Sequence, residues 1–244
     1  MTRFRSFAAT DAGPRRRHNE DSYVDRPDLG LWAVADGAGG HQAGEVASGM
    51  IRTALEAIPE GLEANRLLAE VRGRLLGVHA ALREEAKRRG PGALVASTVA
   101  VLLARGNHFA ALWAGDSRIY LLRNGVLSQI TRDHSLVQEM VDAGALAPEE
   151  AERHPHANVI TRAVGAGDEA LVLDKVTGTG MPGDRYLLCS DGLSKTLSEA
   201  EITTLLAMPN SEPPAQRLLA AALAREAGDN VTAVVMIWPA GHDM

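Results

Sequence analysis

The chain has 244 residues, 45% of them hydrophobic, and is therefore long enough to bury a substantial core within one large domain. Its net charge is -6, with Lys and Arg scattered apart from two short runs at 15–17 and 87–89, which argues against nucleic acid as a partner. The absence of a signal-peptide stretch or a membrane-spanning stretch, together with a single cysteine, predicts a cytoplasmic protein without membrane association or an internal disulfide.

The first part of the chain predicts three strands followed by two helices. Residues 3–9, 21–26 and 30–35 have the composition of strands. Apolar residues then recur at helical spacing over 43–58, after a glycine-rich turn. A second helix is expected over about 62–87, and Gly90 and Pro91 end it.

The middle of the chain predicts antiparallel hairpins. Strands are expected at 98–103, 109–113, 118–122 and 127–130, and the short turns at 105–107 and 124–125 favour hairpin pairing. A short helix over about 134–143 precedes a polar, weakly periodic segment at 144–167, which we interpret as a flap.

The last third predicts strands at 170–176 and 185–190, helices at 198–207 and 213–227, and a β-branched strand at 231–238. No internal repeat or Pro/Ser-rich linker divides the chain, so we expect a single domain over 1–244, with a flap subregion at about 136–167. Hairpin-linked strands and two separate helical pairs favour sheets covered by helices, a layered α+β architecture.

Carboxylates recur where apolar runs stop. Three such runs end at an aspartate next to glycine, namely Asp36, Asp116 and Asp191, and acidic clusters at 19–21 and 228–230 flank two further strands. An ionised carboxylate at the edge of a core is costly unless a cation or hydrogen bonds compensate it. Because no comparable supply of Lys or Arg accompanies these aspartates in the sequence, a divalent metal site is predicted.

The residue types fit phosphate ester hydrolysis. Mg²⁺ and Mn²⁺ prefer oxygen ligands, and strand ends present carboxylates rigidly. Two such ions about 3.5–4 Å apart lower the pKa of a bridging water and stabilise displacement at phosphorus. Arg16 suits a phosphoryl group as a planar, bidentate donor, and glycines beside the aspartates let the backbone approach the ions.

The ordered motifs resemble those of the metal-dependent protein phosphatase family, type 2C, in its compact bacterial form. They run from about residue 10 to residue 235 and include Asp36-Gly37, Gly115-Asp116, Asp191-Gly192 and Asp229-Asn230. Further matches occur at 16–21, 97–98 and 133–135. The resemblance implies a four-layer α/β/β/α sandwich, with two central antiparallel sheets flanked by helix pairs and the metal site, with the flap near it, at one end.

The resemblance also implies a role for each matching residue. Two Mn²⁺ or Mg²⁺ ions would be held by four aspartates, with Asp36 bridging them and the carbonyl of Gly37 completing one shell: Asp21, Asp36, Asp191 and Asp229. Members of the bacterial branch often hold a third, looser ion, for which Asp116 and Asp191 are the candidate ligands. Three residues would support the site through water or hydrogen bonds: Glu20, Thr98 and Asn230.

The implied activity is hydrolysis of phosphoserine and phosphothreonine on proteins by a hydroxide between the two ions, while Arg16 orients the phosphate. The partners would be phosphorylated proteins and a cytosolic serine/threonine kinase of eukaryotic type, and we expect a monomer. In many eukaryotic members a histidine after the first Asp-Gly is proposed to protonate the leaving alcohol, but Ala38 occupies this place. His41 and water are the remaining candidates.

Three alternatives remain open. A catalytically inactive relative could use the same surface to bind phosphoproteins, although all four core aspartates are present. A second alternative keeps the metals but takes a phosphodiester or a nucleotide as substrate. A cysteine phosphatase is disfavoured, because Lys195 stands where such an enzyme needs arginine and Cys189 lies in an apolar run that predicts burial. The pair His154 and His156 is a poor metal signal and fits a surface flap better.

Overall fold

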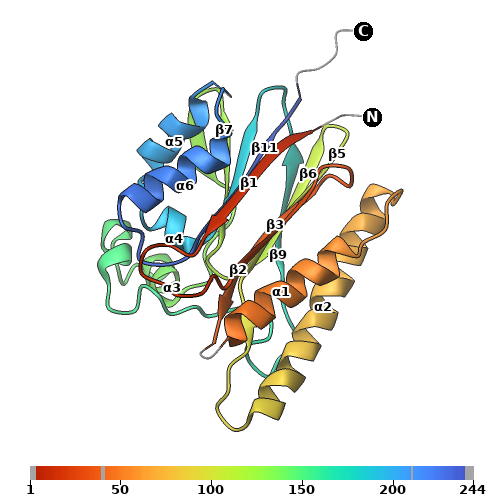
Figure 1. Cartoon of the computed structure of the whole chain (residues 1–244), viewed down its shortest axis with the longest axis vertical. Helices are drawn as coiled ribbons and strands as arrows, with labels where there is room; N and C mark the ends of the chain where they lie inside the picture. Colours follow the sequence, from red (N-terminus) through yellow and green to blue (C-terminus); the bar gives the residue numbers. More distant parts are fainter. Residues whose placement is uncertain (1–3, 40–41, 210, 240–244) are drawn as a thin grey trace.

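The structure, a computed structural model, describes residues 4–39, 42–209 and 211–239. Groups of strands and groups of helices follow one another along the chain (Figure 1). The strands are β1 (Arg5–Asp11), β2 (Asp21–Arg26), β3 (Leu31–Ala38), β4 (Ala96–Ser97), β5 (Val99–Arg105), β6 (His108–Ala114), β7 (Arg118–Arg123), β8 (Val126–Gln129), β9 (Asp174–Thr179), β10 (Arg185–Cys189) and β11 (Val231–Ile237). The helices are α1 (Ala43–Glu56), α2 (Ala64–Arg89), α3 (Leu136–Asp142), α4 (Asp191–Ser194), α5 (Glu199–Ala207) and α6 (Pro214–Ala224), with a 3-10 helix at Pro148–Arg153.

Two antiparallel sheets form the centre of the molecule. One has the strand order β1-β11-β10-β7-β8, and the other has the order β2-β3-β5-β6-β9, with β4 paired to β3. Helices α1 and α2 cover the second sheet, while α5 and α6 cover the first, as Figure 1 shows. The expected four-layer α/β/β/α sandwich is therefore the observed fold.

The buried apolar side chains form three layers, one between the sheets and one between each sheet and its helices. In β3, Trp32 and Val34 face the space between the sheets, whereas Leu31, Ala33 and Ala35 face α1 and α2. In β10 and β11, alternate residues likewise face the space between the sheets, and the residues between them face α5 and α6. Successive side chains of a strand point to opposite faces, so strands buried on both sides must be apolar throughout.

Two of the crossings between the sheets lie beside Asp116 and Asp21. Between β6 and β7 it passes from the second sheet to the first through 115–117, where Gly115 has a φ of 114°. A Cβ at this glycine would lie 2.6 Å from the Thr98 side chain, so the crossing requires both the backbone conformation and the small residue. The link from β1 to β2, residues 12–20, also crosses between the sheets.

Some expected boundaries were wrong. β9 begins at Asp174 rather than at residue 170, because Leu171 and Leu173 pack into the helix-facing core before the strand pairs with β6. The one-turn helix α4 was missed, since four residues carry no periodicity. Within the flap, the 3-10 helix follows α3, and bridges of Ser97 to Val164 and Ser135 to Ile160 tie both ends of the segment down.

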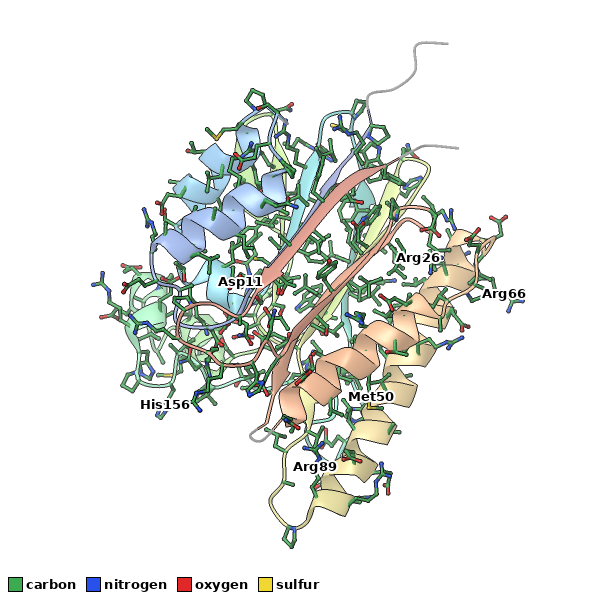
Figure 2. The ribbon with its side chains drawn as sticks, viewed as in Figure 1. Asp11, Arg26, Met50, Arg66, Arg89 and His156 are labelled. Atoms are coloured by element: carbon green, nitrogen blue, oxygen red, sulfur yellow. The ribbon has the colours of Figure 1, made fainter. Side chains whose placement is uncertain are left out.

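Side chains occupy the space between the ribbons throughout the molecule, as Figure 2 shows. Arg66 and Arg89 project outward near the two ends of α2 (Figure 2). Among the described residues, no helix combines the length and the apolar character needed to cross a bilayer.

Candidate metal centre

The predicted metal ligands converge at one end of the two sheets. Asp21 is the first residue of β2 and lies directly opposite Asp36 of β3 in the strand register. Asp191 follows β10 as the first residue of α4, and Asp229 precedes β11. Because these strands are antiparallel, starts and ends of strands alternate along one edge, so residues far apart in the sequence meet there.

Hydroxyl groups of the first sheet hold Asp21 of the second. The Oδ2 atom of Asp21 accepts hydrogen bonds from the Ser190 hydroxyl at 2.7 Å and the Thr232 hydroxyl at 2.6 Å. Ser190 also accepts from the backbone N–H of Thr232 at 3.0 Å. Neither hydroxyl was assigned a role from the sequence, although Ser190 directly precedes Asp191 and Thr232 follows Asp229 by three residues.

Thr98 fixes the backbone of Asp36. Its hydroxyl accepts from the N–H of Asp36 at 3.0 Å, and its own N–H donates to the Asp36 carbonyl at 2.8 Å. The same hydroxyl lies 2.7 Å from the Ser117 hydroxyl, next to Asp116. Thr98 thus connects the end of β3 with the crossing between the sheets.

Asn230 organises the link that carries Arg16 and Glu20. Its carbonyl oxygen accepts from the N–H of Glu20 at 2.8 Å. Its amide nitrogen donates to the carbonyls of Ala12 at 2.8 Å and His18 at 2.9 Å. One side chain therefore holds three points of the 12–20 link beside the aspartates.

Close backbone approaches require glycine at two positions. A Cβ on Gly44 of α1 would lie 2.7 Å from the carbonyl oxygen of Gly37, so α1 packs directly on the Asp36-Gly37 turn. A Cβ on Gly192 would collide with the carbonyl of Asn230, which holds α4 against the start of β11. The glycines beside the aspartates thus bring separate backbones together.

The carboxylates repel one another electrostatically. Burial raises the pKa of Asp21 to about 7, and the charges of Asp191 and Asp229 add to this effect. Burial and the neighbouring aspartates raise the pKa of Asp36 well above its usual range. Burial, followed by the charge of Asp191, raises the pKa of Asp116 to about 6. The cluster is therefore unfavourable as a set of anions unless cations neutralise it.

Two cations of the chain lie among these carboxylates, contrary to the expectation that the aspartates lack basic neighbours. The Arg16 guanidinium bonds Asp229 Oδ2 at 2.7 Å. The Lys195 ammonium bonds Asp191 Oδ2 at 2.7 Å and lies 3.6 Å from Asp116 Oδ2. Lys195 stands four residues after Asp191, a spacing that brings side chains together in a helical turn and could have revealed the pair.

The donor set nevertheless fits divalent metal. No group of three or more acidic, histidine or cysteine side chains in the described part of the chain has the arrangement of a formed metal site, and several carboxylate oxygens bond Arg16, Lys195 or hydroxyls instead. However, Asp21 Oδ1 and Asp191 Oδ1 are buried without a hydrogen-bond partner. Buried, unpartnered carboxylate oxygens are costly in protein alone and are the ligands that Mg²⁺ and Mn²⁺ prefer.

The remaining candidates lie elsewhere or outside the description. His41 falls outside the described residues. Cys189 is fully buried, and burial raises the pKa of its thiol to about 12, as an inert core residue requires. The rings of His154 and His156 lie 5.5 Å apart on the flap, after the 3-10 helix.

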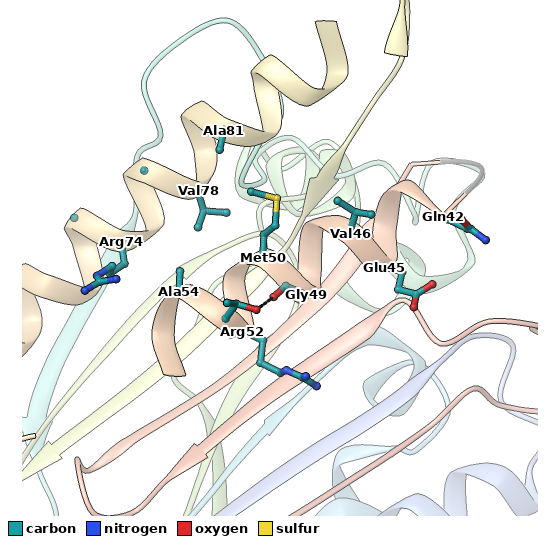
Figure 3. A pocket seen from close by; sticks show the side chains of 13 residues that line it. Gln42, Glu45, Val46, Gly49, Met50, Arg52, Ala54, Arg74, Val78 and Ala81 are labelled. Atoms are coloured by element: carbon teal, nitrogen blue, oxygen red, sulfur yellow. Dashed lines mark hydrogen bonds between the residues drawn. The ribbon is translucent and has the colours of Figure 1, made fainter. Parts of the chain in front are cut away.

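A groove of about 870 Å³ follows α1 and α2, away from the carboxylates. Figure 3 shows Val46 and Met50 of α1 opposite Val78 and Ala81 of α2 in this groove. Among the described residues that line it, Glu45 alone is acidic, so they do not supply a ligand set for metal-assisted chemistry.

The chain is similar to known proteins over most of its length. The sequence pattern of the family described as protein phosphatase 2C matches residues 15–228. The chain is 38% identical over 231 residues to the serine/threonine protein phosphatase PstP of Mycobacterium tuberculosis, covering 95% of this chain but 44% of that protein. It therefore spans less than half the length of this relative.

Solved structures share the whole fold. The structure of PppA, a key regulatory component of T6SS in Pseudomonas aeruginosa, superposes with a TM-score of 0.88 at 42% identity and covers 96% of both chains. The catalytic domain of PstP, in complex with two manganese ions, superposes with a TM-score of 0.80 at 38% identity, covering 96% of this chain and 97% of that one.

Proposed function

The chain belongs to the protein phosphatase 2C family, and we propose that it hydrolyses phosphoserine and phosphothreonine on proteins with Mn²⁺ or Mg²⁺ as cofactor. The observation that carries this proposal is the convergence of carboxylates from both sheets at one end of the sandwich, where Asp21 Oδ1 and Asp191 Oδ1 are buried without partners. The two manganese ions bound to the PstP catalytic domain support the same chemistry.

We assign the metal ligands from this cluster. The two ions would be held by Asp36 and the carbonyl of Gly37, together with three further carboxylates: Asp21, Asp191 and Asp229. When bound, the ions would activate water and stabilise the charge that develops on the phosphoryl oxygens. No side-chain nucleophile is required for this reaction, which agrees with the burial of Cys189.

Residues of the chain position the substrate and the ligands. About half of the Arg16 side chain is exposed beside Asp229, so its guanidinium is placed to hold a phosphoryl group bidentately. Ser190 and Thr232 keep Asp21 oriented, and Thr98 holds the backbone of Asp36. Rigid placement of the ligands matters, because a small displacement of the groups that position the reacting atoms lowers the rate of catalysis.

The leaving oxygen needs a proton, and Ala38 cannot supply one. Water and His41 are the proposed donors. The proposed substrates are phosphoproteins, and the proposed role is to oppose a cytosolic serine/threonine kinase of eukaryotic type, with the protein acting as a monomer.

Substitution of the central aspartates tests the metal assignment. Asp36→Asn and Asp191→Asn should each lower the release of phosphate from a phosphothreonine peptide, and of p-nitrophenol from its phosphate, by about a thousandfold or more, because the ions contribute several kcal/mol to the barrier. The measurement is initial rate at saturating Mn²⁺, with folding checked by circular dichroism.

Cys189→Ser is the matched control and should retain most activity. Loss of activity in the cysteine variant together with full activity in both aspartate variants would refute the metal assignment. Binding of the phosphopeptide without phosphate release, with Mn²⁺ bound, would instead support an inactive phosphoprotein-binding regulator. Faster turnover of a cyclic dinucleotide than of the peptide would support a phosphodiesterase.

A further inference from the structure

Lys195 occupies a specific place beside the metal centre. It follows the one-turn helix α4, and its N–H donates to the carbonyl of Asp191 at 2.8 Å. This turn directs the side chain back over Asp191, so that the ammonium lies 2.7 Å from Asp191 Oδ2 and 3.6 Å from Asp116 Oδ2. Only 28% of the Lys195 side chain is exposed.

Carboxylates surround the positive charge of Lys195. Its ammonium, a compact point charge, bonds Asp191 Oδ2 and lies at ion-pair distance from Asp116 Oδ2. It therefore supplies a positive charge beside both carboxylates.

The same ammonium reaches the flap. It donates a hydrogen bond to the side-chain carbonyl of Asn158 at 2.8 Å. Asn158 belongs to the flap and follows the 3-10 helix. It precedes Ile160 and Val164, whose bridges to Ser135 and Ser97 tie the flap to the rest of the fold. An ammonium has three donors, and three oxygens from separate segments surround this one: Asp191 Oδ2, Asn158 Oδ1 and, at ion-pair distance, Asp116 Oδ2.

We propose that the Lys195 ammonium is a built-in cation at the place where Asp116 and Asp191 would otherwise hold a third divalent ion. It also positions the flap through Asn158. A divalent ion bound by these carboxylates would lie within a few ångströms of a positive charge, so it has to displace Lys195 before it can bind. The protein accordingly works with two ions, and Lys195 acts as a positioning residue. This inference rests on the proposed function.

Metal stoichiometry tests the inference independently of activity. The metal-depleted 244-residue chain is equilibrated by dialysis against Mn²⁺ up to millimolar concentration, and bound metal is measured by elemental analysis. The expected result is two ions for the unchanged chain and for Lys195→Arg, which keeps the charge, and three ions for Lys195→Ala and Lys195→Gln. Thermal unfolding of each metal-free variant verifies that it is folded.

Two further variants identify the cause of the added ion. The double variant Lys195→Ala with Asp116→Asn should bind one ion fewer than Lys195→Ala alone, because Asp116→Asn removes a ligand of the third site. Asn158→Ala removes the flap contact but keeps the ammonium, and it should bind the same number of ions as the unchanged chain. A gain of an ion in Asn158→Ala would show that the flap, rather than the charge, excludes it.

The inference is overturned if the unchanged chain binds as many ions as Lys195→Ala. Failure of this inference is distinguishable from failure of the proposed function, because the inference is tested by the difference in the number of bound ions between the unchanged chain and Lys195→Ala. The proposed function is judged by whether the unchanged chain binds two ions and releases phosphate from a phosphopeptide.

Discussion

Arg16 combines two interactions that a lysine cannot reproduce together. Its guanidinium bonds Asp229 Oδ2 at 2.7 Å, and about half of its side chain remains exposed toward solvent. A planar fork of five donors can contact a carboxylate with one edge and a phosphoryl group with another, whereas an ammonium is a single point charge.

Arg16→Lys should therefore raise the KM for a phosphothreonine peptide by about tenfold, because loss of one charge-assisted hydrogen bond costs about 1.5 kcal/mol. The turnover number should change less than KM if Arg16 acts mainly in binding. Steady-state kinetics at saturating Mn²⁺ give both constants. Arg17→Lys is the matched control, since Arg17 is an exposed residue of the same run, and its KM should stay unchanged. Equal effects of both substitutions would contradict the bidentate role.

At the residue scale, the sequence indicated the acidic residues and some of their neighbours, namely Arg16, Thr98 and Asn230. Carboxylates at the ends of apolar runs are unusual enough to be recognised, as Asp36 and Asp191 were. Only the spacing of Lys195 to Asp191 gave a local signal among the neighbours that were missed. The contacts of Ser190 with Asp21 and of Lys195 with Asn158 join distant segments, and only the structure gives them.

At the element scale, α1 supports the Asp36-Gly37 turn. Its first turn packs Gly44 onto the carbonyl of Gly37, and Ala43 and Ala47 are buried against the sheet. Small residues on this face allow the helix backbone to lie close to the strand. The position of the Gly37 carbonyl, a proposed ligand, is thus determined by helix packing.

Gly44→Ala should destabilise the protein by about 1–3 kcal/mol, because its Cβ would lie 2.7 Å from the Gly37 carbonyl oxygen and force the backbones apart. Gly73→Ala is the matched control within α2, where an added Cβ meets no atom within 4 Å. It should be neutral or stabilise the protein by up to about 1 kcal/mol, through helix propensity. Urea unfolding measures both changes. A stable Gly44→Ala variant with unchanged Mn²⁺ affinity would contradict the supporting role of α1.

Long periodic elements were predicted well, and short or irregular ones were not. The apolar spacing over 43–58 and 62–87 indicated α1 and α2 to within a few residues, and alternate burial made the strands recognisable. The start of β9 and the single turn of α4 depend on pairing with β6 and on packing against β11. The local sequence of β9 and α4 does not indicate which strands they contact.

At the scale of the whole molecule, the candidate metal centre connects the two sheets. Asp21 and Asp36 belong to the second sheet, whereas Asp191 and Asp229 adjoin strands of the first. Ions bound among these four carboxylates would join the two sheets at one end. In metal-free protein the same carboxylates repel each other across this junction, so stability should depend on both pH and metal.

Metal-free protein should lose stability as pH rises from about 4 to about 7. The ordinary pKa of an aspartate is about 3.9, whereas the folded values are about 7 for Asp21 and about 6 for Asp116, so the folded chain binds more protons than the unfolded chain in this range. Mn²⁺ relieves the repulsion and competes with protons. It should therefore raise the midpoint of thermal unfolding more at pH 7.5 than at pH 5.5.

Asp36→Asn provides the control for this measurement. It removes one buried charge, so its metal-free form should unfold at a higher temperature than the unchanged chain at pH 7.5, and Mn²⁺ should raise that temperature much less. A Mn²⁺ effect of equal size at both pH values, or in both proteins, would contradict the assignment of these carboxylates to the metal.

The sequence by itself determined the layered α+β fold and the acidic residues of the centre, because apolar periodicity and carboxylates at strand ends are local properties of the chain. The tertiary structure decided which cations and hydroxyls surround those carboxylates. Lys195 meets Asp116 and Asn158 only because the β6–β7 crossing, α4 and the flap lie side by side in the folded chain. Contacts between distant segments depend on how the sheets pack, and no local pattern specifies them.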